Sequence, residues 1–595
     1  MPHSTPRPKH QKLSLFFLQG TKGRLWLAEH LHPSELQRTL FWAGLIGVLG
    51  GASTALFRWV VYQVHVLLTR QTTGSMVESF VNLPTWQRLL VPALGGVLAG
   101  LVILLGKRFG RSKNTTDYME AVALGNGVLS MRSSLVKTVS SLFSIASGGS
   151  IGREGPMVQL SALCASQLGR LRKWSTPRRR LMVACGAAAG IASAYNAPIA
   201  GALFVAEIVL GSIAMESFGP LVFASVLATQ TQHFLHGSDP LYKIPQFQMG
   251  TGWDLIVYML LGVLCGVLAP WFLRALRLSE KAFSYIKAPI YVRVGLGGLI
   301  VGLLAIWYPQ VCGNGYSVVT GILNAQWAWQ AILIIFILKI VATCATFGSG
   351  AVGGVFTPTI FVGAAVGYLF GVACPHFWPG TPPIPGALAL AGMGMFLAAT
   401  THAPLMAILM IFEMTLDYQI IMPLMLGCVV AYYAAHGLET HSIYSVTLAR
   451  KGALTFAKHM ARLTVGGLMR KDPVCVLDTA RFSEITRMFI AQTFKYLYVV
   501  DQAGMYLGVI ALHDVKEYLN TPELSDLVIA RELVHDTVPT TCATARLSET
   551  LDLFAQHDGE RLPVLSEEVP AKLVGSIAKS DVFLALVEQK KIGKA

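Results

Sequence analysis

The pattern of hydrophobic and polar positions divides the chain into two parts. From about residue 40 to residue 450, apolar runs follow one another with short polar stretches between them, whereas charged residues become frequent from Leu454 onwards. Six of the runs are close to the roughly 20 residues that a helix needs to cross a bilayer. We predict these six as membrane helices: 40–61, 89–105, 218–235, 255–273, 290–307 and 330–347.

A second set of apolar stretches in the same part is shorter or interrupted by Gly and Pro. These are 136–147, 157–169, 182–192, 196–211, 359–373, 386–400 and 403–416. A helix that stops partway through a membrane is tolerated only where its free backbone lines a protein-enclosed cavity. We therefore predict broken helices around an internal cavity.

The last part of the chain has the pattern of a soluble domain. Strand-like runs at 497–500, 507–510 and 573–577 alternate with amphipathic stretches such as 482–492. This alternation predicts an α/β domain of about 130 residues after the membrane part.

Composition and charge support this division. Of the 595 residues, 53% are hydrophobic and 13% are charged, against about 25% charged in soluble domains. The net charge of +15 comes from Lys and Arg clustered between apolar runs, which is typical of cytoplasmic loops and not of a nucleic-acid-binding stripe. We expect both termini in the cytoplasm, with residues 1–38 as a cytosolic tail and not a signal peptide.

An internal repeat is the most informative feature of the membrane part. The sequence GREGP at 152–156 precedes an apolar run, as GVFTP does at 354–358. Downstream, Asn196-Ala-Pro leads to Glu207 and His402-Ala-Pro leads to Glu413, in both cases after eleven positions. Matches in one order at similar separation predict two homologous halves, about 39–237 and 250–445, an organisation common in transporters.

The repeated turns have the chemistry of an anion site. Pro156 and Pro358 suit the first turn of a helix, and glycine allows close approach of the backbone. Two helix starts that converge near the midplane would present free amides and positive dipole ends to an anion. The carboxylate of Glu154 could occupy the place of that anion, so that protonation or competition would open the path. The alternative is that Glu154 only complements a helix dipole.

These residues resemble the CLC family of chloride channels and transporters, from about residue 40 to the end. The matching features are GREGP, GVFTP and Tyr444 after the last membrane segment. The resemblance implies a mainly α membrane protein, a CLC-type inverted-repeat helical bundle with broken helices (39–452), followed by a cytosolic α/β CBS-pair domain. It further implies a homodimer in a bacterial inner membrane, with one pore per subunit for chloride and other small anions.

Functional residues follow from the same resemblance. Glu154 is implied as the gate of a channel of the voltage-gated class, and the Tyr444 hydroxyl as an inner ligand of the anion. The backbone around the two turns is implied as the anion site, at Gly152, Arg153, Gly155, Val355 and Phe356.

Two departures from the family pattern affect the expected mechanism. The usual GSGIP motif is missing, and its counterpart lies near 113–117, where Asn114 or Thr115 could donate a hydrogen bond. Family exchangers carry a proton-accepting glutamate one position beyond Glu207, where this chain has Ile208. We therefore expect channel-like or weakly proton-coupled chloride transport, with a chloride/proton antiporter as the alternative.

The soluble part resembles a pair of CBS motifs, at 465–530 and 531–590. Such pairs often bind adenine nucleotides, and Asp514 and Asp581 are the implied ribose contacts. The alternative is that the pair only supports dimerisation.

Other classes of function have less support in the sequence. No phosphate loop, metal-ligand cluster or nucleophile motif is present, so we expect no enzyme activity, no metal and no required cofactor. The nine cysteines form no CxxC pair and are expected to be packing residues. The alternative from a different class of function is a membrane sensor or scaffold that transports no ion.

Overall fold

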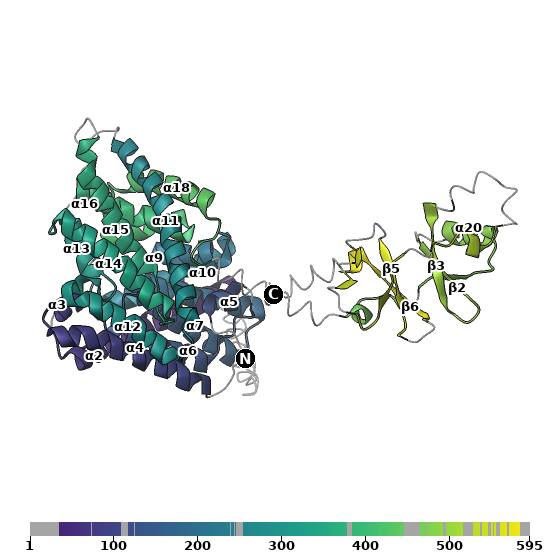
Figure 1. Ribbon diagram of the computed structural model, residues 1–595, viewed down its shortest axis with the longest axis horizontal. Coiled ribbons are helices and arrows are strands. Elements are labelled where there is room, and N and C mark those ends of the chain that lie inside the picture. Colours follow the sequence, from purple (N-terminus) through teal and green to yellow (C-terminus); the bar gives the residue numbers. More distant parts are fainter. Residues whose placement is uncertain are drawn as a thin grey trace, which may run out of the picture. The chain divides into compact units, whose positions relative to one another are not determined.

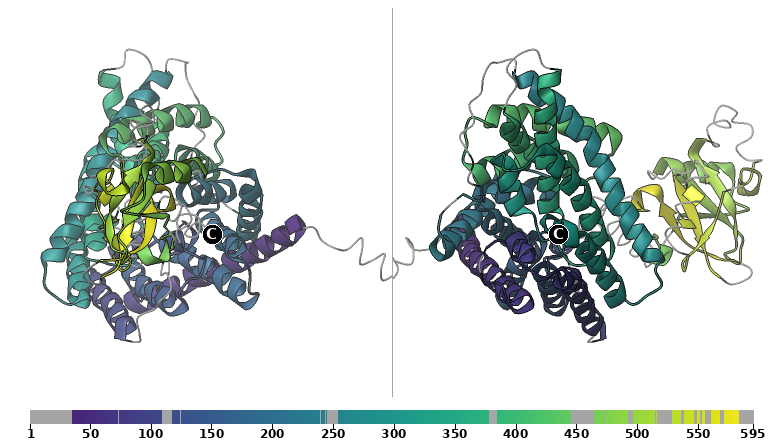
Figure 2. Two further views of the ribbon diagram at one scale, coloured as in Figure 1. Left: turned by 90° about the vertical axis from the view of Figure 1, so that its right-hand side faces the viewer. Right: turned by 60° about the vertical axis from the view of Figure 1, so that its left-hand side comes forward.

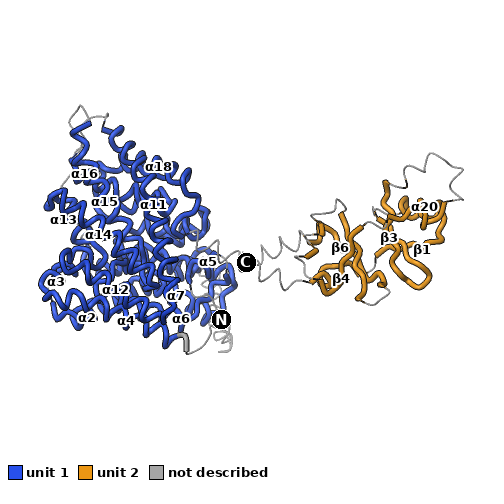
Figure 3. Tube along the Cα trace, viewed as in Figure 1, with its two compact units in different colours: residues 1–447 blue, residues 448–595 orange. Residues whose placement is uncertain are grey.

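The computed structural model describes residues 35–582, apart from 73, 109–116, 124, 239, 243, 245–253, 378–383, 445–463, 472, 492–495, 514, 516–527, 536–537, 546–548, 551–552, 555–559 and 568–570. The chain forms two compact units, residues 1–447 and 448–595 (Figure 3). The predicted boundary at residue 452 and most of the predicted N-terminal tail lie outside the described residues.

The first unit consists of helices (Figure 1). Its first half contains α2 (Glu35–Thr69), α3 (Met76–Val81), α4 (Thr85–Arg108), α5 (Tyr118–Ala123), α6 (Met131–Ala146), α7 (Glu154–Leu171), α8 (Thr176–Tyr195), α9 (Pro198–Phe204), the π-helix η1 (Val205–Leu210) and α10 (Met215–His236). The second half contains α11 (Asp254–Tyr285), α12 (Ile290–Trp307), η2 (Pro309–Val311), α13 (Tyr316–Leu323), α14 (Trp329–Gly348), α15 (Phe356–Ala373), η3 (Cys374–His376), α16 (Pro385–Thr401), α17 (Pro404–Thr415) and α18 (Ile421–Leu438).

Seven helices of the described residues are long and apolar enough to cross a membrane: α2, α4, α11, α12, α14, α18, and α15 with its short extension η3. Five predicted spans lie in α2, α4, α11, α12 and α14, and the sixth, 218–235, forms α10. The sequence pattern missed α18, because Pro423, Gly427 and His436 interrupt its apolar run. The shorter predicted stretches form α6 to α9 and α15 to α17.

The two halves repeat one packing scheme. Helix α2 packs on α10 as α11 packs on α18, and α7 packs on α8 as α15 packs on α16. Asn196 and His402 end α8 and α16 with the same left-handed φ of 57°. In the first unit, the purple and blue helices of the first half gather at one end and the green helices at the other (Figure 2). These features confirm the predicted helical fold built from two repeats.

The second unit contains two three-stranded sheets of one design. Their strands are β1 (Cys475–Leu477), β2 (Tyr496–Val500) and β3 (Tyr506–Ala511), then β4 (Thr541–Cys542), β5 (Arg561–Leu565) and β6 (Leu573–Ala578). In each sheet the first two strands are parallel, the last two are antiparallel, and the register shifts near the end of the middle strand. Short 3₁₀ turns, η4 (Val465–Gly467) and η6 (Ala530–Glu532), precede each sheet.

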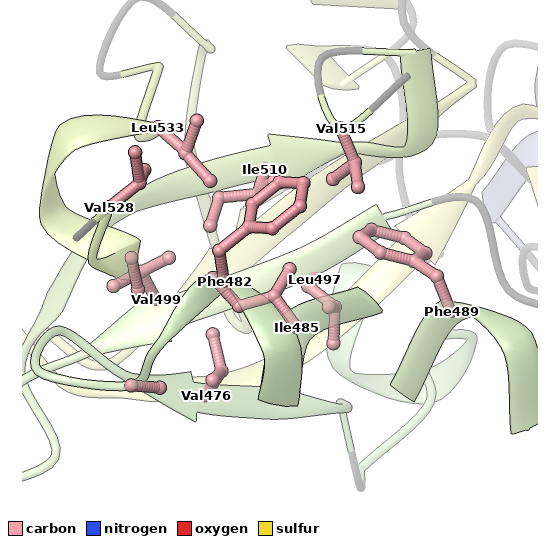
Figure 4. Close-up of a cluster of buried hydrophobic side chains, with 12 residues drawn as sticks. Val476, Phe482, Ile485, Phe489, Leu497, Val499, Ile510, Val515, Val528 and Leu533 are labelled. Atoms are coloured by element: carbon pink, nitrogen blue, oxygen red, sulfur yellow. The ribbon is translucent and has the colours of Figure 1, made fainter. Parts of the chain in front are cut away.

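The amphipathic stretch predicted in this unit forms α20 (Phe482–Ala491). Its apolar face places Phe482, Ile485 and Phe489 against Leu497 and Ile510 of the first sheet (Figure 4). Burial of large apolar side chains on one face holds a single helix on a small sheet. The predicted α/β pattern is therefore confirmed.

Candidate functional site

The two repeated turns meet inside the helical unit. Gly152 N–H donates to the carbonyl oxygen of Gly354 at 2.7 Å, and Gly354 N–H donates to Gly152 at 2.9 Å. A Cβ atom at either position would collide with the carboxylate of Glu154 as it lies here, so the two glycines leave room for that carboxylate between the turns. The predicted convergence of the two helix starts is confirmed.

Glu154 is the first residue of α7, and its side chain is 3% exposed. Its carboxylate accepts the Thr357 N–H at 3.2 Å and the Thr357 hydroxyl at 3.1 Å, and it also faces the N–H of Phe356. These donors belong to the first turn of α15, in the other half of the repeat. The carboxylate therefore lies where free amides and a helix dipole stabilise an anion.

Two hydroxyl residues of this site were not identified from the sequence. Thr357 Oγ1 lies 3.1 Å from the hydroxyl of Tyr195, whose ring centroid is 5.0 Å from that of Phe356. The hydroxyl of Thr357 within an apolar repeated turn is a local sequence signal for a polar contact at this place. Tyr195 offers no local signal, because its partner is 162 residues away in the chain.

A cavity of about 290 Å³ adjoins the carboxylate and is lined by four of the nine residues predicted for the gate and the anion site. Its lining includes Glu154, Gly155, Gly354, Val355 and Tyr444. A lysine, Lys137, also lines it and adds positive charge. We call it the Glu154 cavity.

The remaining predicted residues lie elsewhere. The predicted residues Phe356 and Tyr444 both contact the ring of Phe204, which packs edge-on against each of them. The centroids of the Phe204 and Tyr444 rings are 5.6 Å apart. Asn114 and Thr115 lie outside the described residues, although Asp117 of the same segment lines the Glu154 cavity. Arg153 lines a different cavity.

The two acidic residues of the repeat exchange contacts between the halves. Glu413 of α17 accepts the N–H groups of Ile199 and Ala200 at 2.9 and 2.8 Å, in the first turn of α9. Glu207 accepts the N–H of Met406 at 2.9 Å, in the first turn of α17. Each carboxylate thus caps a helix that begins with proline, where free N–H groups need an acceptor.

Buried Lys339 of α14 is a further residue that sequence reasoning missed. Its side chain is 0% exposed, and its ammonium donates to the carbonyl oxygens of Val311 and Gly313 at 2.8 and 2.7 Å. Nothing in a lone lysine within an apolar run indicates these partners, which come from a separate turn.

In the second unit, the carboxylate of Asp581 accepts the N–H of Ala578 at 3.3 Å and lies 3.9 Å from Arg470. Asp514 lies outside the described residues. All nine cysteines are free thiols.

The fold and its converging turns define a membrane transport protein built from two repeats with broken helices. Residues 95–436 match the family model described as voltage gated chloride channel, and residues 465–521 match the CBS domain model. The chain belongs to the CLC family of voltage-gated chloride channels and carries a C-terminal CBS domain.

Several known proteins are similar to this chain. A putative chloride channel protein ClcB-like from Ralstonia nicotianae is 50% identical over 412 residues, which cover 69% of this chain and 96% of that protein. The voltage-gated ClC-type chloride channel ClcB of Escherichia coli O9:H4 is 40% identical over 412 residues, 68% of this chain and 98% of that protein.

Solved structures give the same assignment of fold. A slow cyanobacterial Cl⁻/H⁺ antiporter has a TM-score of 0.62 and 28% identity, and the match covers 71% of this chain and 99% of that one. A eukaryotic CLC transporter, 18% identical with a TM-score of 0.58, matches in fold over 91% of this chain and 98% of its own.

Proposed function

We propose that this protein conducts chloride across a bacterial inner membrane, through the Glu154 cavity, with Glu154 as the gate. The main support for the proposal is the position of the Glu154 carboxylate beside the first turn of α15. There it accepts hydrogen bonds from the N–H and the hydroxyl of Thr357. A carboxylate at this place is chemically equivalent to a bound halide, since both are desolvated monoanions held by amide dipoles.

Gating follows because the Glu154 carboxylate and a chloride ion compete for the same hydrogen-bond donors. When the Glu154 side chain leaves, the amides of Phe356 and Thr357 become free to receive chloride from the cavity. Tyr444, which lines the same cavity, supplies a hydroxyl donor on the inner side. A site of neutral donors binds the ion weakly enough for it to leave again.

The transport is channel-like or only weakly coupled to protons. Glu207 is engaged as the acceptor for Met406 N–H, and the next residue, Ile208, cannot carry a proton. The second candidate function is a chloride/proton antiporter, which is favoured by the similarity to a slow Cl⁻/H⁺ antiporter at 28% identity.

Flux from liposomes that contain the purified protein tests these functions. We expect chloride efflux that moves no protons against their gradient, whereas stoichiometric proton uptake would establish the antiporter. Absence of any anion flux would leave a membrane sensor or scaffold as the function.

The gate is tested by Glu154→Gln in the same assay. This variant should conduct chloride with no dependence on pH, because the side chain no longer titrates. Glu216→Gln, which changes an exposed glutamate in the first turn of α10, is the matched control and should keep the wild-type pH dependence. An unchanged pH dependence in Glu154→Gln would refute the assigned gate.

The proposal extends to assembly and to the second unit. We place both termini in the cytoplasm and expect a homodimer with one pore in each subunit. The second sheet, β4–β5–β6, repeats the strand order of the first, which supports a second CBS repeat. We propose that the pair binds an adenine nucleotide in a cleft that uses Asp514 and Asp581. Equilibrium binding of ATP to the full-length protein tests this cleft, and binding that is unaffected by Asp581→Asn would exclude the role of Asp581.

A further inference from the structure

A second cavity of about 240 Å³ in the helical unit carries two arginines. Arg58 of α2 and Arg153, which immediately precedes α7, both line it. The described lining residues also include His65, Asn314 and Ser317, and none of them is Asp or Glu. We call it the arginine cavity; it shares no lining residue with the Glu154 cavity.

The two guanidinium groups lack a protein counter-charge within the described part of the chain. Neither Arg58 nor Arg153 has a carboxylate within ion-pair distance among those residues. The Nε of Arg153 is buried without a hydrogen-bond partner there, and its guanidinium lies 5.4 Å from the ring centroid of Tyr316. Partly buried like charges that share a cavity are costly unless an anion neutralises them.

The hydrogen-bond donors that line the arginine cavity determine which kind of anion fits it. A guanidinium presents paired N–H groups in a planar fork that matches two oxygens of an oxyanion, a geometry that a spherical halide cannot use. Two such groups match a charge of −2, and Asn314 and Ser317 can donate to the remaining oxygens. We infer that the arginine cavity binds a divalent tetrahedral oxyanion, of the class of sulfate and hydrogen phosphate.

Occupancy of this cavity would act on transport through the neighbouring residue. Arg153 and Glu154 are consecutive, yet each lines a different cavity. A dianion held at Arg153 repels an incoming chloride, so it should slow chloride flux. This consequence rests on the proposed function, whereas binding of the oxyanion does not.

Isothermal titration of sodium sulfate into the purified full-length protein in detergent tests the site directly. The reference titration uses sodium gluconate at equal ionic strength, so that screening is matched. We expect saturable sulfate binding in the wild type and about a tenfold or greater loss of affinity in Arg58→Gln, because one charge-assisted fork is removed. Arg38→Gln, which changes an exposed arginine earlier in the same helix, should bind as the wild type does.

A lysine variant keeps the test decisive if Arg58→Gln folds poorly. Arg58→Lys retains the charge but not the fork, so its affinity should also fall, by less than in Arg58→Gln. Sulfate binding no stronger than that of gluconate, or equal affinity in the Arg58 and Arg38 variants, would overturn the inference. Phosphate titrated at pH 8 should behave as sulfate does.

Chloride flux from liposomes separates this inference from the proposed function. Sulfate on both sides should lower the flux of the wild type and lower that of Arg58→Gln less, each relative to its own rate without sulfate. Protein that binds sulfate but carries no chloride would refute chloride transport and leave the oxyanion site standing. Chloride transport without sulfate binding would refute the site alone.

Discussion

The hydroxyl of Thr357 donates a 3.1 Å hydrogen bond to the carboxylate of Glu154 and so joins the two halves of the helical unit at their converging turns. The backbone N–H of the same threonine makes a second bond at 3.2 Å, and the Tyr195 hydroxyl supports the Thr357 side chain from 3.1 Å. Thr357 therefore holds the proposed gate in its closed position with both its backbone and its side chain.

Removal of the Thr357 hydroxyl should favour the open gate. Thr357→Val keeps the shape of the side chain but loses the hydrogen bond to a charged group, which is worth about 1.5–3 kcal/mol. We expect chloride flux at neutral pH to rise by about tenfold in liposomes. Thr357→Ser retains the hydroxyl and should stay close to the wild type. Equal flux in the Val and Ser variants would show that the hydroxyl does not restrain the gate.

Removal of either repeat glutamate should lower stability, and by different amounts. Glu413→Ala leaves the N–H groups of Ile199 and Ala200 without their acceptor at a buried site, whereas Glu207→Ala removes the acceptor of Met406 and a contact with the Leu405 N–H at a less buried site. Each unsatisfied donor costs about 1–3 kcal/mol where it is buried. Both substitutions remove the same atoms, so thermal unfolding in detergent compares them directly. We expect the larger drop in Tm for Glu413→Ala, and the reverse order would contradict the capping roles.

Substitution of buried Lys339 should also destabilise the helical unit. Lys339→Met leaves the carbonyl oxygens of Val311 and Gly313 without the donor that now satisfies them. The expected loss is about 2–4 kcal/mol, because two acceptors are orphaned. Lys281→Met, at an exposed position of α11, is the control and should unfold as the wild type does. A Tm of Lys339→Met equal to that of the control would show that water replaces the ammonium.

The ion pair at the end of α18 should make stability depend on pH. Arg277 donates to Glu439, the residue after α18, at 2.5 Å, and this hydrogen bond lowers the pKa of Glu439 from its ordinary 4.5. A carboxyl whose pKa is lowered by folding adds stability above its unfolded pKa, and loses it as pH falls through the lowered value. The partly exposed pair is worth about 0.2–1 kcal/mol.

The measurement for this pair is Tm against pH for the wild type and Glu439→Gln. The wild type should be slightly more stable from about pH 5.5 to 7.5, and the difference should shrink as pH falls below the ordinary pKa of 4.5 and through the lowered pKa of Glu439. A difference that persists unchanged to pH 3.5 would mean that the carboxylate charge is not its source.

Much of the fold was predictable, because a bilayer imposes long apolar runs and a repeat imposes matching signatures. The helices from α6 to α9 were predictable as broken segments, and Gly152 and Gly354 as the turns that meet. Helix α18 was not predicted, because proline, glycine and histidine interrupt its run of apolar residues. Its position is determined by the helices that pack against it. Asn114 and Thr115 remain predictions, because they lie outside the described residues.

By itself the sequence determined that this is a two-repeat membrane protein with a soluble tail, and that Glu154 stands at a helix start. Those properties are local or periodic, so they can be read from neighbouring residues. The tertiary structure alone decided which groups meet Glu154, Lys339 and Arg58, since hydrogen bonds and shared cavities join segments that are remote along the chain. Such contacts depend on how helices pack, and no local pattern encodes them.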